Sequence, residues 1–396
     1  MDGLRERVRA WRIAASTSMR AAAVGAFATT SLLLDAAQGL QGQQPGYRMD
    51  QRPSLVVSDH SGGVPFVSLV GSVTLSNQSI WAVDEGESRA TLYSPAGRPI
   101  KSIGRQGGGP GEFRTISWLG LCTPDTLSIF DAAQGRVSRI DAEGKLVDVS
   151  PVSMSGIGVV LPTGAPVYEL FCSRGGRVAA VSWPVGPPPS EPGPHRGTVR
   201  VATASGFKEP LRELGTFPGP ERYRFARSDG PRPFGKRLHV ALSSTRLFVG
   251  SADSFFVEAF DLAGARQRPA AATVPAKKFD RANEDYLLST MFRKATAPAD
   301  RQRAKVALAE HKFPEWYPAY TKLLVDTSDR LWVQLPSSLG DTVQQWYAFD
   351  ERGRTIARLA VPVALQLHEI GNAHVMGRWT EADGTESLRR FAVYAR

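Results

Sequence analysis

The stretch LFVGSADSFFVEAFDLAG, residues 247–264, contains the two signals that decide the fold. It begins with a short apolar run that is typical of a buried strand. It ends with Asp261 and, three positions later, Gly264. Asp at the first position of a type I turn caps the turn with its side-chain oxygen, and glycine at the fourth position adopts the positive φ of a tight hairpin. The stretch therefore predicts a strand followed by a hairpin tip.

The same hairpin tip occurs in five copies. They are YSPAG (93–97), IDAEG (140–144), ATASG (202–206), FDLAG (260–264) and FDERG (349–353). A short apolar strand precedes each copy, at IWAVD (80–84), LSIFD (127–131), VAAVSW (178–183), LFVGS (247–251) and LWVQL (331–335). Such a repeat predicts small structural units that stack side by side.

A sixth unit is cut short by the end of the chain. AHVMGRW (373–379) is its upstream strand, and SLRRFAVYAR (387–396) ends where the next hairpin tip would begin. The missing outer strand must come from elsewhere, and SLVVS (54–58) is the candidate. Pairing of these two segments would close a ring without an open edge. The sequence thus predicts an all-β fold, a six-bladed β-propeller closed by an N-terminal strand in the last blade.

The glycine-rich stretch GRQGGGPGEF (104–113) is a candidate phosphate-binding loop. A Walker loop requires a lysine after its second glycine, but Pro110 follows Gly109. A dinucleotide-binding fingerprint requires a helix after the glycines, but the next residues have the composition of a strand. We therefore interpret the stretch as the crossing from the outer strand of one blade to the inner strand of the next, with Phe113 filling the gap between the blades.

These motifs resemble those of exported bacterial six-bladed propeller proteins related to the NHL-repeat and YWTD-type propellers. The similar segments are DTSDRLWV (326–333), IDAEGK (140–145) and IGRQGGGPGEF (103–113). The resemblance covers roughly residues 50–396. Asp329 stands where the family has glycine, but Asp tolerates the left-handed conformation. The family has little assigned chemistry, so the resemblance implies the fold and not a reaction.

The N-terminal segment is typical of an export signal. Several arginines precede the apolar run AAAVGAFATTSLLL (21–34), which is shorter than the about 20 residues of a membrane span. We predict a signal segment over residues 1–39, cleaved near Gly39, a linker over 40–53 and the propeller over 54–396. An uncleaved anchor is the competing interpretation, and Met19 is an alternative start. The predicted location is periplasmic or secreted, with no stable membrane span after cleavage.

Residues 277–322 form an insertion between the fourth and fifth units. Two helices are predicted within it, and Pro298 suits the first turn of the second. The pair is either a lid on the central channel or a connection that packs on the rim, and we favour the connection. The aromatic segment FPEWYPAY (313–320) either seats the insertion on the propeller or lines a pocket.

The titratable residues do not identify a reaction. The formal net charge is +10, but the basic residues are scattered, which argues against nucleic-acid binding. The sequence contains no HExxH motif, no GxSxG elbow and no EF-hand loop. The histidines are His60, His195, His239, His311, His368 and His374. We expect a solvated His195 and a structural role for His368 and His374, and we predict no metal site and no cofactor. The catalytic and binding residues stay unassigned.

Cys122 and Cys172 are the only cysteines of the chain. An exported protein can join them, but two cysteines in so large a domain do not make a disulfide framework. The sequence leaves their pairing open and favours free, buried thiols.

Two functions are compatible with these observations. The first is a non-catalytic binding or scaffolding role outside the cytoplasm, with a protein, peptide or glycan ligand at one rim or in the mouth of the channel. The alternative is a metal-assisted hydrolase or lyase with its site at the central channel. Converging carboxylate, Asn or His side chains at the mouth would favour the enzyme, whereas Arg and aromatic side chains would favour binding. We favour binding, because function depends on a site and no motif declares one.

Overall fold

The computed structural model describes residues 46–60, 63–152, 167–184, 189–225, 229–280, 312–338 and 340–395, with a few isolated positions between these ranges. The regular structure of these ranges consists of β-strands. The described part of the chain contains no helix that is long and apolar enough to cross a membrane. These ranges are therefore all-β, as the sequence predicts for the propeller.

Three four-stranded antiparallel sheets share one order, in which each strand pairs with the next along the chain. The first contains β3 (Leu69–Thr74), β4 (Ile80–Asp84), β5 (Arg89–Tyr93) and β6 (Pro99–Ile103). The second contains β7 (Ile116–Thr123), β8 (Thr126–Asp131), β9 (Arg136–Ile140) and β10 (Leu146–Pro151). The third contains β16 (His239–Leu242), β17 (Arg246–Gly250), β18 (Phe256–Asp261) and β19 (Arg266–Ala271).

Two larger sheets contain the remaining strands. A five-stranded sheet consists of β11 (Val167–Cys172), β12 (Val178–Ser182), β13 (Gly193–Ala204), β14 (Arg212–Arg224) and β15 (Asp229–Pro231). A nine-stranded sheet consists of β20 (Lys322–Val325), β21 (Leu331–Gln334), β22 (Val343–Phe349), β23 (Thr355–Pro362), β24 (Leu365–Ile370), β25 (His374–Thr380), β26 (Glu386–Ala395), β1 (Gly46–Met49) and β2 (Leu55–Val57).

The two N-terminal strands pair with the last strand of the chain. β2 is antiparallel to β26, with Leu55 opposite Arg390 and Val57 opposite Leu388. This confirms the predicted pairing of residues 54–58. β1 lies within the segment for which the sequence predicts a linker, and it pairs with both β26 and β23. Through β1, the hairpins β20–β23 and β24–β26 become one continuous sheet.

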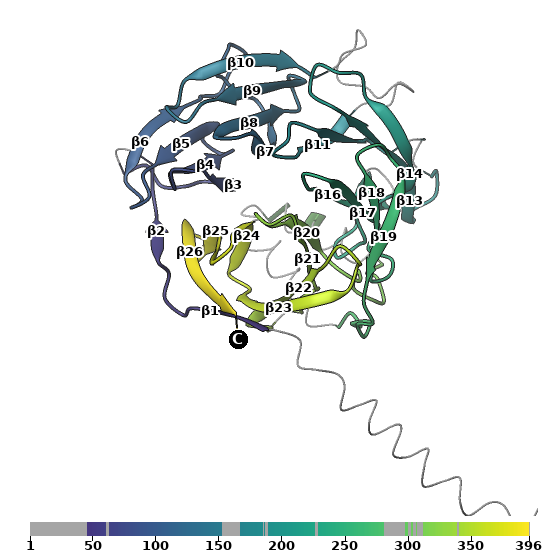
Figure 1. The fold of residues 1–396 in the computed structure, drawn as a ribbon. Coiled ribbons are helices and arrows are strands. Elements are labelled where there is room, and N and C mark those ends of the chain that lie inside the picture. The colour runs from purple at the N-terminus through teal and green to yellow at the C-terminus, as the bar shows by residue number, and fades with distance from the viewer. Residues whose placement is uncertain are drawn as a thin grey trace, which may run out of the picture. The chain divides into compact units, whose positions relative to one another are not determined.

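The first strands of successive hairpin groups contact one another in turn, and we call them the inner strands. They are β3, β7, β11, β16, β20 and β24, and β24 contacts β3 again. Within residues 45–396, Figure 1 shows the sheets following one another around a common centre, with these strands nearest to it. The arrangement is consistent with a β-propeller.

The hairpin tips have the predicted geometry in four of the five copies. Gly97, Gly144, Gly264 and Gly353 have φ values of 80°, 77°, 91° and 72°. Asp141, for example, accepts hydrogen bonds from the backbone N–H groups of Glu143 and Lys145. The prediction is wrong at Gly206, which does not have a positive φ, because the connection between β13 and β14 is longer than a tight hairpin.

Two further positions with positive φ are relevant to the sequence motifs. Asp329 has a φ of 62°, so it adopts the left-handed conformation that the resemblance requires of it. Gly104 has a φ of 110°, and a Cβ there would lie 2.5 Å from the carbonyl oxygen of Ser88. Glycine is therefore required at the start of the crossing.

The glycine-rich crossing runs from β6 to β7, as predicted. Phe113 is fully buried in a cluster that includes Trp81 of the first sheet and Ile129 of the second. The guanidinium group of Arg136 donates to the carbonyl oxygens of Gly108, Gly109 and Glu112. Because the backbone of the crossing is bonded to its own neighbours, it fixes the position of Phe113 between the two sheets.

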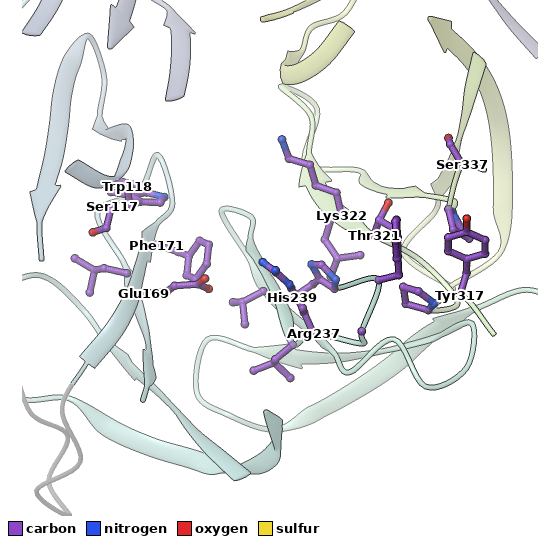
Figure 2. Close-up of a pocket in the computed structure, with 18 residues that line it drawn as sticks. Ser117, Trp118, Glu169, Phe171, Arg237, His239, Tyr317, Thr321, Lys322 and Ser337 are labelled. Atoms are coloured by element: carbon purple, nitrogen blue, oxygen red, sulfur yellow. The ribbon is translucent and has the colours of Figure 1, made fainter. Parts of the chain in front are cut away.

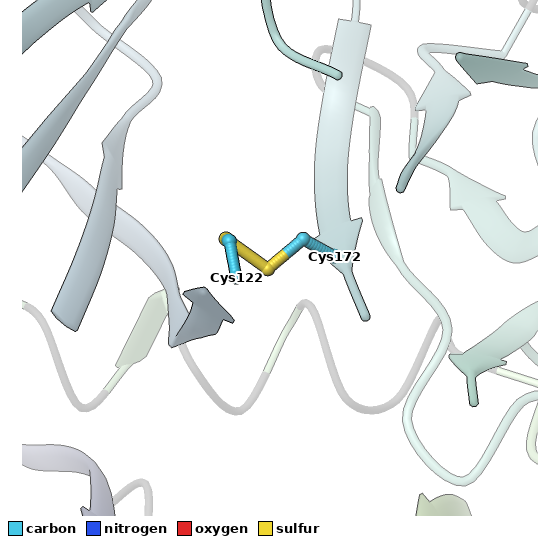
Figure 3. The surroundings of a disulfide bond; sticks show 2 residues. All are labelled: Cys122 and Cys172. Atoms are coloured by element: carbon cyan, nitrogen blue, oxygen red, sulfur yellow. A yellow bond between two sulfur atoms is a disulfide. The ribbon is translucent and has the colours of Figure 1, made fainter. Parts of the chain in front are cut away.

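Cys122 and Cys172 form a disulfide, so the expectation of free thiols is wrong. Their Cα atoms are 5.3 Å apart, because the residues lie at or next to the ends of two neighbouring strands, β7 and β11. Figure 3 shows the bond between the two strand ends. The sequence separation of 50 residues means that the bond closes a long loop, which restricts the unfolded chain strongly.

Two predictions fall mainly outside the described residues. The signal segment over residues 1–39 is one of them. The helical insertion is the other, because helical geometry is recorded only at isolated positions between 298 and 306. The two ends of the insertion are described, and they pair antiparallel at Lys278 and Trp316.

Replacement of Phe113 by Ala is expected to lower the free energy of unfolding by about 3–5 kcal/mol, because it leaves a cavity between two sheets. Chemical denaturation followed by circular dichroism measures the change. Ile100, on the outer strand β6, is 57% exposed and provides the control, since I100A is expected to cost less than about 1 kcal/mol. Equal losses in the two variants would contradict the role assigned to Phe113.

Candidate functional site

A cavity of about 500 Å³ opens where four of the inner strands begin, and we call it the mouth cavity. Its walls come from β7, β11, β16 and β20, from the connections that precede β16 and β20, and from the segment that follows β21. Figure 2 shows its labelled side chains, with Trp118, Glu169 and Phe171 on one side and Arg237, His239 and Lys322 facing them. Its volume is in the range of small-ligand sites.

Aromatic side chains form much of the wall. Trp118 and Phe171 come from the inner strands, and Phe234 and Tyr317 come from the connections. The rings of Phe234 and Tyr317 pack edge to face, with centroids 5.8 Å apart. Gly120 leaves room for Trp118, since a Cβ there would lie 2.5 Å from the indole ring. The segment 313–320 therefore contributes to the cavity, which was one of the two roles considered for it.

The charged residues of the cavity have unusual titration properties. Burial raises the pKa of Glu169 to about 7, although Arg237 opposes the shift. Burial, with Arg237 and Lys322, lowers the pKa of His239 to about 4. Burial and the nearby charge of Arg378 lower the pKa of Lys322 to about 8. At neutral pH the mouth therefore carries two cations, a neutral imidazole and a partly ionised carboxyl group, and its net charge is positive.

Nothing in the sequence groups Glu169, His239 and Lys322. His239 and Lys322 are the first residues of β16 and β20, and Glu169 is near the start of β11. No spacing in the sequence connects them, because each belongs to a different repeat. The three residues share a position near the beginning of an inner strand. This shared position can be recognised only after the inner strands are known from the fold.

His195 is not solvated, contrary to the prediction. It lies near the start of β13, in a strand that pairs with β14. Its Nε2 atom lies 2.6 Å from Asp229 Oδ1, and its side chain is 17% exposed. The extended hairpin β13–β14 and the short strand β15 bring the two residues together.

His60, His368 and His374 occupy three different environments. His60 is fully buried, with its ring nitrogens 2.8 Å from Thr91 Oγ1 and 3.2 Å from Asp84 Oδ2. The Nε2 atom of His374 lies 2.9 Å from Glu369 Oε1, which supports a structural role. His368 lies in the channel instead, with Nδ1 3.1 Å from Ser72 Oγ. His311 lies outside the described residues.

Glu369 joins the last hairpin group to the first sheet. Its Oε2 atom accepts a hydrogen bond of 2.8 Å from the backbone N–H of Thr74. Burial would raise the pKa of Glu369, but the contacts with His374 and Thr74 hold it below its ordinary value. Glu369 is thus an ionised, buried connector between β24 and β3, and it does not belong to the mouth cavity.

No group of three or more His, Cys, Asp or Glu side chains suited to a metal ion occurs in the part of the chain that the structure describes. Among the described residues that line the mouth cavity, Glu169 is the one carboxyl group and His239 the one imidazole, beside cationic and aromatic residues. This composition is closer to the lining of Arg and aromatic side chains that would favour binding than to the converging carboxylate, Asn or His side chains of an enzyme.

No protein-family model matches this chain, and no curated protein matches it. Solved structures are similar in fold. A member of the DUF4221 family from Bacteroides vulgatus aligns with a TM-score of 0.50 and 9% identity, over 89% of this chain and 100% of that chain. A Bacteroides fragilis protein described as exported aligns with a TM-score of 0.46 and 11% identity, over 88% of this chain and 95% of that chain.

Virginiamycin B lyase from Staphylococcus aureus, solved as an inactive variant with quinupristin, aligns with a TM-score of 0.40 and 8% identity, over 87% of this chain and 99% of that chain. The neighbours are propeller-type proteins. At 9% identity the similarity to the DUF4221 protein concerns the fold alone. The two structures with lower TM-scores support no further conclusion.

The replacement E169Q is expected to change the pH dependence of stability. Burial raises the pKa of Glu169 to about 7 in the folded protein, from the ordinary value of 4.5. The contribution of Glu169 to the free energy of unfolding is therefore highest below pH 4.5. It falls as the pH rises to 7, because the folded cavity disfavours the carboxylate. Since the side chain is partly exposed, we expect E169Q to gain about 1–2 kcal/mol over the wild type between pH 5 and pH 8.

Denaturation at a series of pH values measures this difference. The exposed residue Glu143 provides the control, and E143Q is expected to follow the wild-type profile. Parallel profiles for E169Q and the wild type would show that Glu169 titrates normally.

Proposed function

We propose that this chain is a six-bladed β-propeller exported from the cytoplasm, with a non-catalytic ligand-binding role. The blade count is supported by the closed series of contacts among β3, β7, β11, β16, β20 and β24. On this view the nine-stranded sheet is two blades, β20–β23 and β24–β26 with β2, joined by β1. The propeller would comprise residues 54–396, with a signal segment over residues 1–39 and an insertion over 277–322.

Export is supported by the disulfide. A bond between Cys122 and Cys172 persists in an oxidising compartment such as the periplasm or the outside of the cell. The basic and apolar character of the N-terminal segment points the same way. The location proposed is therefore periplasmic or secreted.

The lining of the mouth cavity supports a binding role. Aromatic rings such as Trp118 and Phe171 stack on the flat or apolar parts of a ligand, whereas Arg237 attracts its polar or anionic groups. A protein segment, a peptide or a glycan would offer both kinds of group. The single observation that carries the proposal is this combination of aromatic and cationic side chains in one cavity of about 500 Å³.

The alternative function, a metal-assisted hydrolase or lyase, is tested by metal content. Elemental analysis of protein purified without chelators would give less than one bound metal ion per chain if the role is binding alone. Stoichiometric metal, together with turnover of a bound compound, would favour the enzyme.

A binding screen tests the proposed function. Ligand-observed NMR with a panel of short peptides and oligosaccharides is expected to find ligands whose affinity falls by about tenfold or more in W118A, because a stacked aromatic surface is lost. Trp316 lies outside the mouth cavity and is 44% exposed, so W316A is the matched control. Ligands that bind W118A and the wild type equally would place the site elsewhere, and a panel without any ligand would contradict the proposal.

A further inference from the structure

A second cavity of about 360 Å³ continues from the mouth cavity along the channel, and we call it the waist cavity. Every inner strand contributes to its lining, and it shares Trp118, Phe171 and Lys322 with the mouth cavity. The ionisable side chains among its described lining residues are Lys322 and His368. The waist cavity is therefore the place where an end of a ligand bound in the mouth would meet buried polar groups.

Lys322 brings a positive charge to this cavity without an opposing carboxylate. Its Nζ donates a hydrogen bond of 2.6 Å to the carbonyl oxygen of Leu367. Within the described ranges, Lys322 forms no ion pair with Asp or Glu. The nearby Arg378 is paired with Glu386, at 3.1 Å. A partly buried cation without an anion is unfavourable, so the site is incomplete as an ion pair.

His368 adds a hydrogen-bonding group without a partner. It lies at an irregularity of β24, where the pairing with β25 shifts between Leu367 and Glu369. Such a bulge turns a side chain in a direction that a regular strand does not allow. The Nδ1 atom contacts Ser72 Oγ at 3.1 Å, but the buried Nε2 atom has no hydrogen-bond partner among the described residues. Most buried polar atoms have a hydrogen-bond partner, so this atom marks a place where a bound group or a water molecule would fit.

We propose that the waist cavity binds a carboxylate group of the ligand between the ammonium group of Lys322 and the Nε2–H of His368. In this arrangement the hydroxyl of Ser72 donates to Nδ1, so that the proton of the ring is on Nε2 and is donated to the carboxylate. Trp118 and Phe171 line both cavities and would contact the part of the ligand next to the carboxylate. The proposal rests on the proposed binding function and adds the chemical class of the ligand.

The charge of the site favours a carboxylate over a dianion. Lys322 supplies one positive charge, and burial together with the charges of Lys322 and Arg378 lowers the pKa of His368 well below its ordinary value, so the imidazole is neutral. One cation and one neutral donor match a group with one negative charge. The carboxylate can be the C-terminus of a peptide or the acid group of a sugar, and the experiment separates these sources.

The test compares ligands that differ only in this group. Benzoate is expected to bind the full chain about tenfold or more tightly than benzamide, because a charge-assisted hydrogen bond is lost in the amide. Binding of benzoate is expected to shift the ring ¹⁵N signal of His368, which H368Q assigns. In K322M the affinity for benzoate is expected to fall to that for benzamide. The exposed Lys208 provides the matched control, K208M.

The same titrations identify the source of the carboxylate. Short peptides with a free or an amidated C-terminus form one arm, and acidic or neutral oligosaccharides form the other. A preference for the free C-terminus identifies a peptide, and a preference for the acidic sugar identifies a glycan. No preference for the charged member in either arm would overturn the proposal.

Other outcomes separate this proposal from the binding function itself. If neutral ligands bind in the mouth and depend on Trp118, but benzoate binds K322M and the wild type equally, the binding function stands and the carboxylate site is wrong. If benzoate shifts the His368 signal but no peptide or oligosaccharide of the panel binds, the carboxylate site stands and the proposed function fails. If the His368 signal is unchanged at saturating benzoate, the partner of Nε2 is water and the proposed carboxylate site is wrong. K322Q serves as a second variant if K322M does not fold.

Discussion

The fold depends on the pairing of the N-terminal strands β1 and β2 with β26, because this contact joins the two ends of a long series of sheets. Each sheet buries its faces against its neighbours, and the last sheet can meet the first only if the chain closes on itself. Leu55 and Val57 are buried together with Leu69 and Leu388, so the closure is also a hydrophobic contact between the first and last sheets. Glu369 reinforces it by accepting a hydrogen bond from Thr74.

Closure has a direct consequence for the channel. The inner strands are held around one channel, so residues that are far apart in sequence line one space. The disulfide between β7 and β11 fixes one pair of these strands, and the crossing that holds Phe113 fixes the contact between the first two sheets. The mouth and waist cavities are thus products of the arrangement of strands and do not come from any single segment.

The sequence predicted the elements that depend on local chemistry. Turn residues predicted the hairpin tips, and glycine predicted the crossing at residues 104–113. The count of strands predicted that residues 54–58 pair with the last strand. The structure confirms the crossing, the pairing and four of the five hairpin tips. The error at Gly206 has a physical reason, since a longer connection does not require a positive φ. The disulfide was missed because the distance between two strand ends depends on how sheets pack, which spacing in the sequence does not report.

The candidate site could not be predicted for the same reason. Glu169, His239 and Lys322 have no motif in common, and only the ring brings them to one cavity. The protonation states of these residues depend on burial, which is a property of the assembled sheets. His368 was recognised in the sequence as half of a histidine pair, but its position in the channel follows from the bulge in β24.

Hydrogen exchange at the closure tests the account most directly. The backbone N–H groups of Asp50 and Ser54 donate to the carbonyl oxygens of Ala392 and Arg390, at 2.9 and 2.7 Å. If the ring is closed as described, these two amides exchange as slowly as those of β25, because they open only when the last sheet opens. Exchange of both amides at the rate of an unstructured peptide, while β25 remains protected, would contradict the closure.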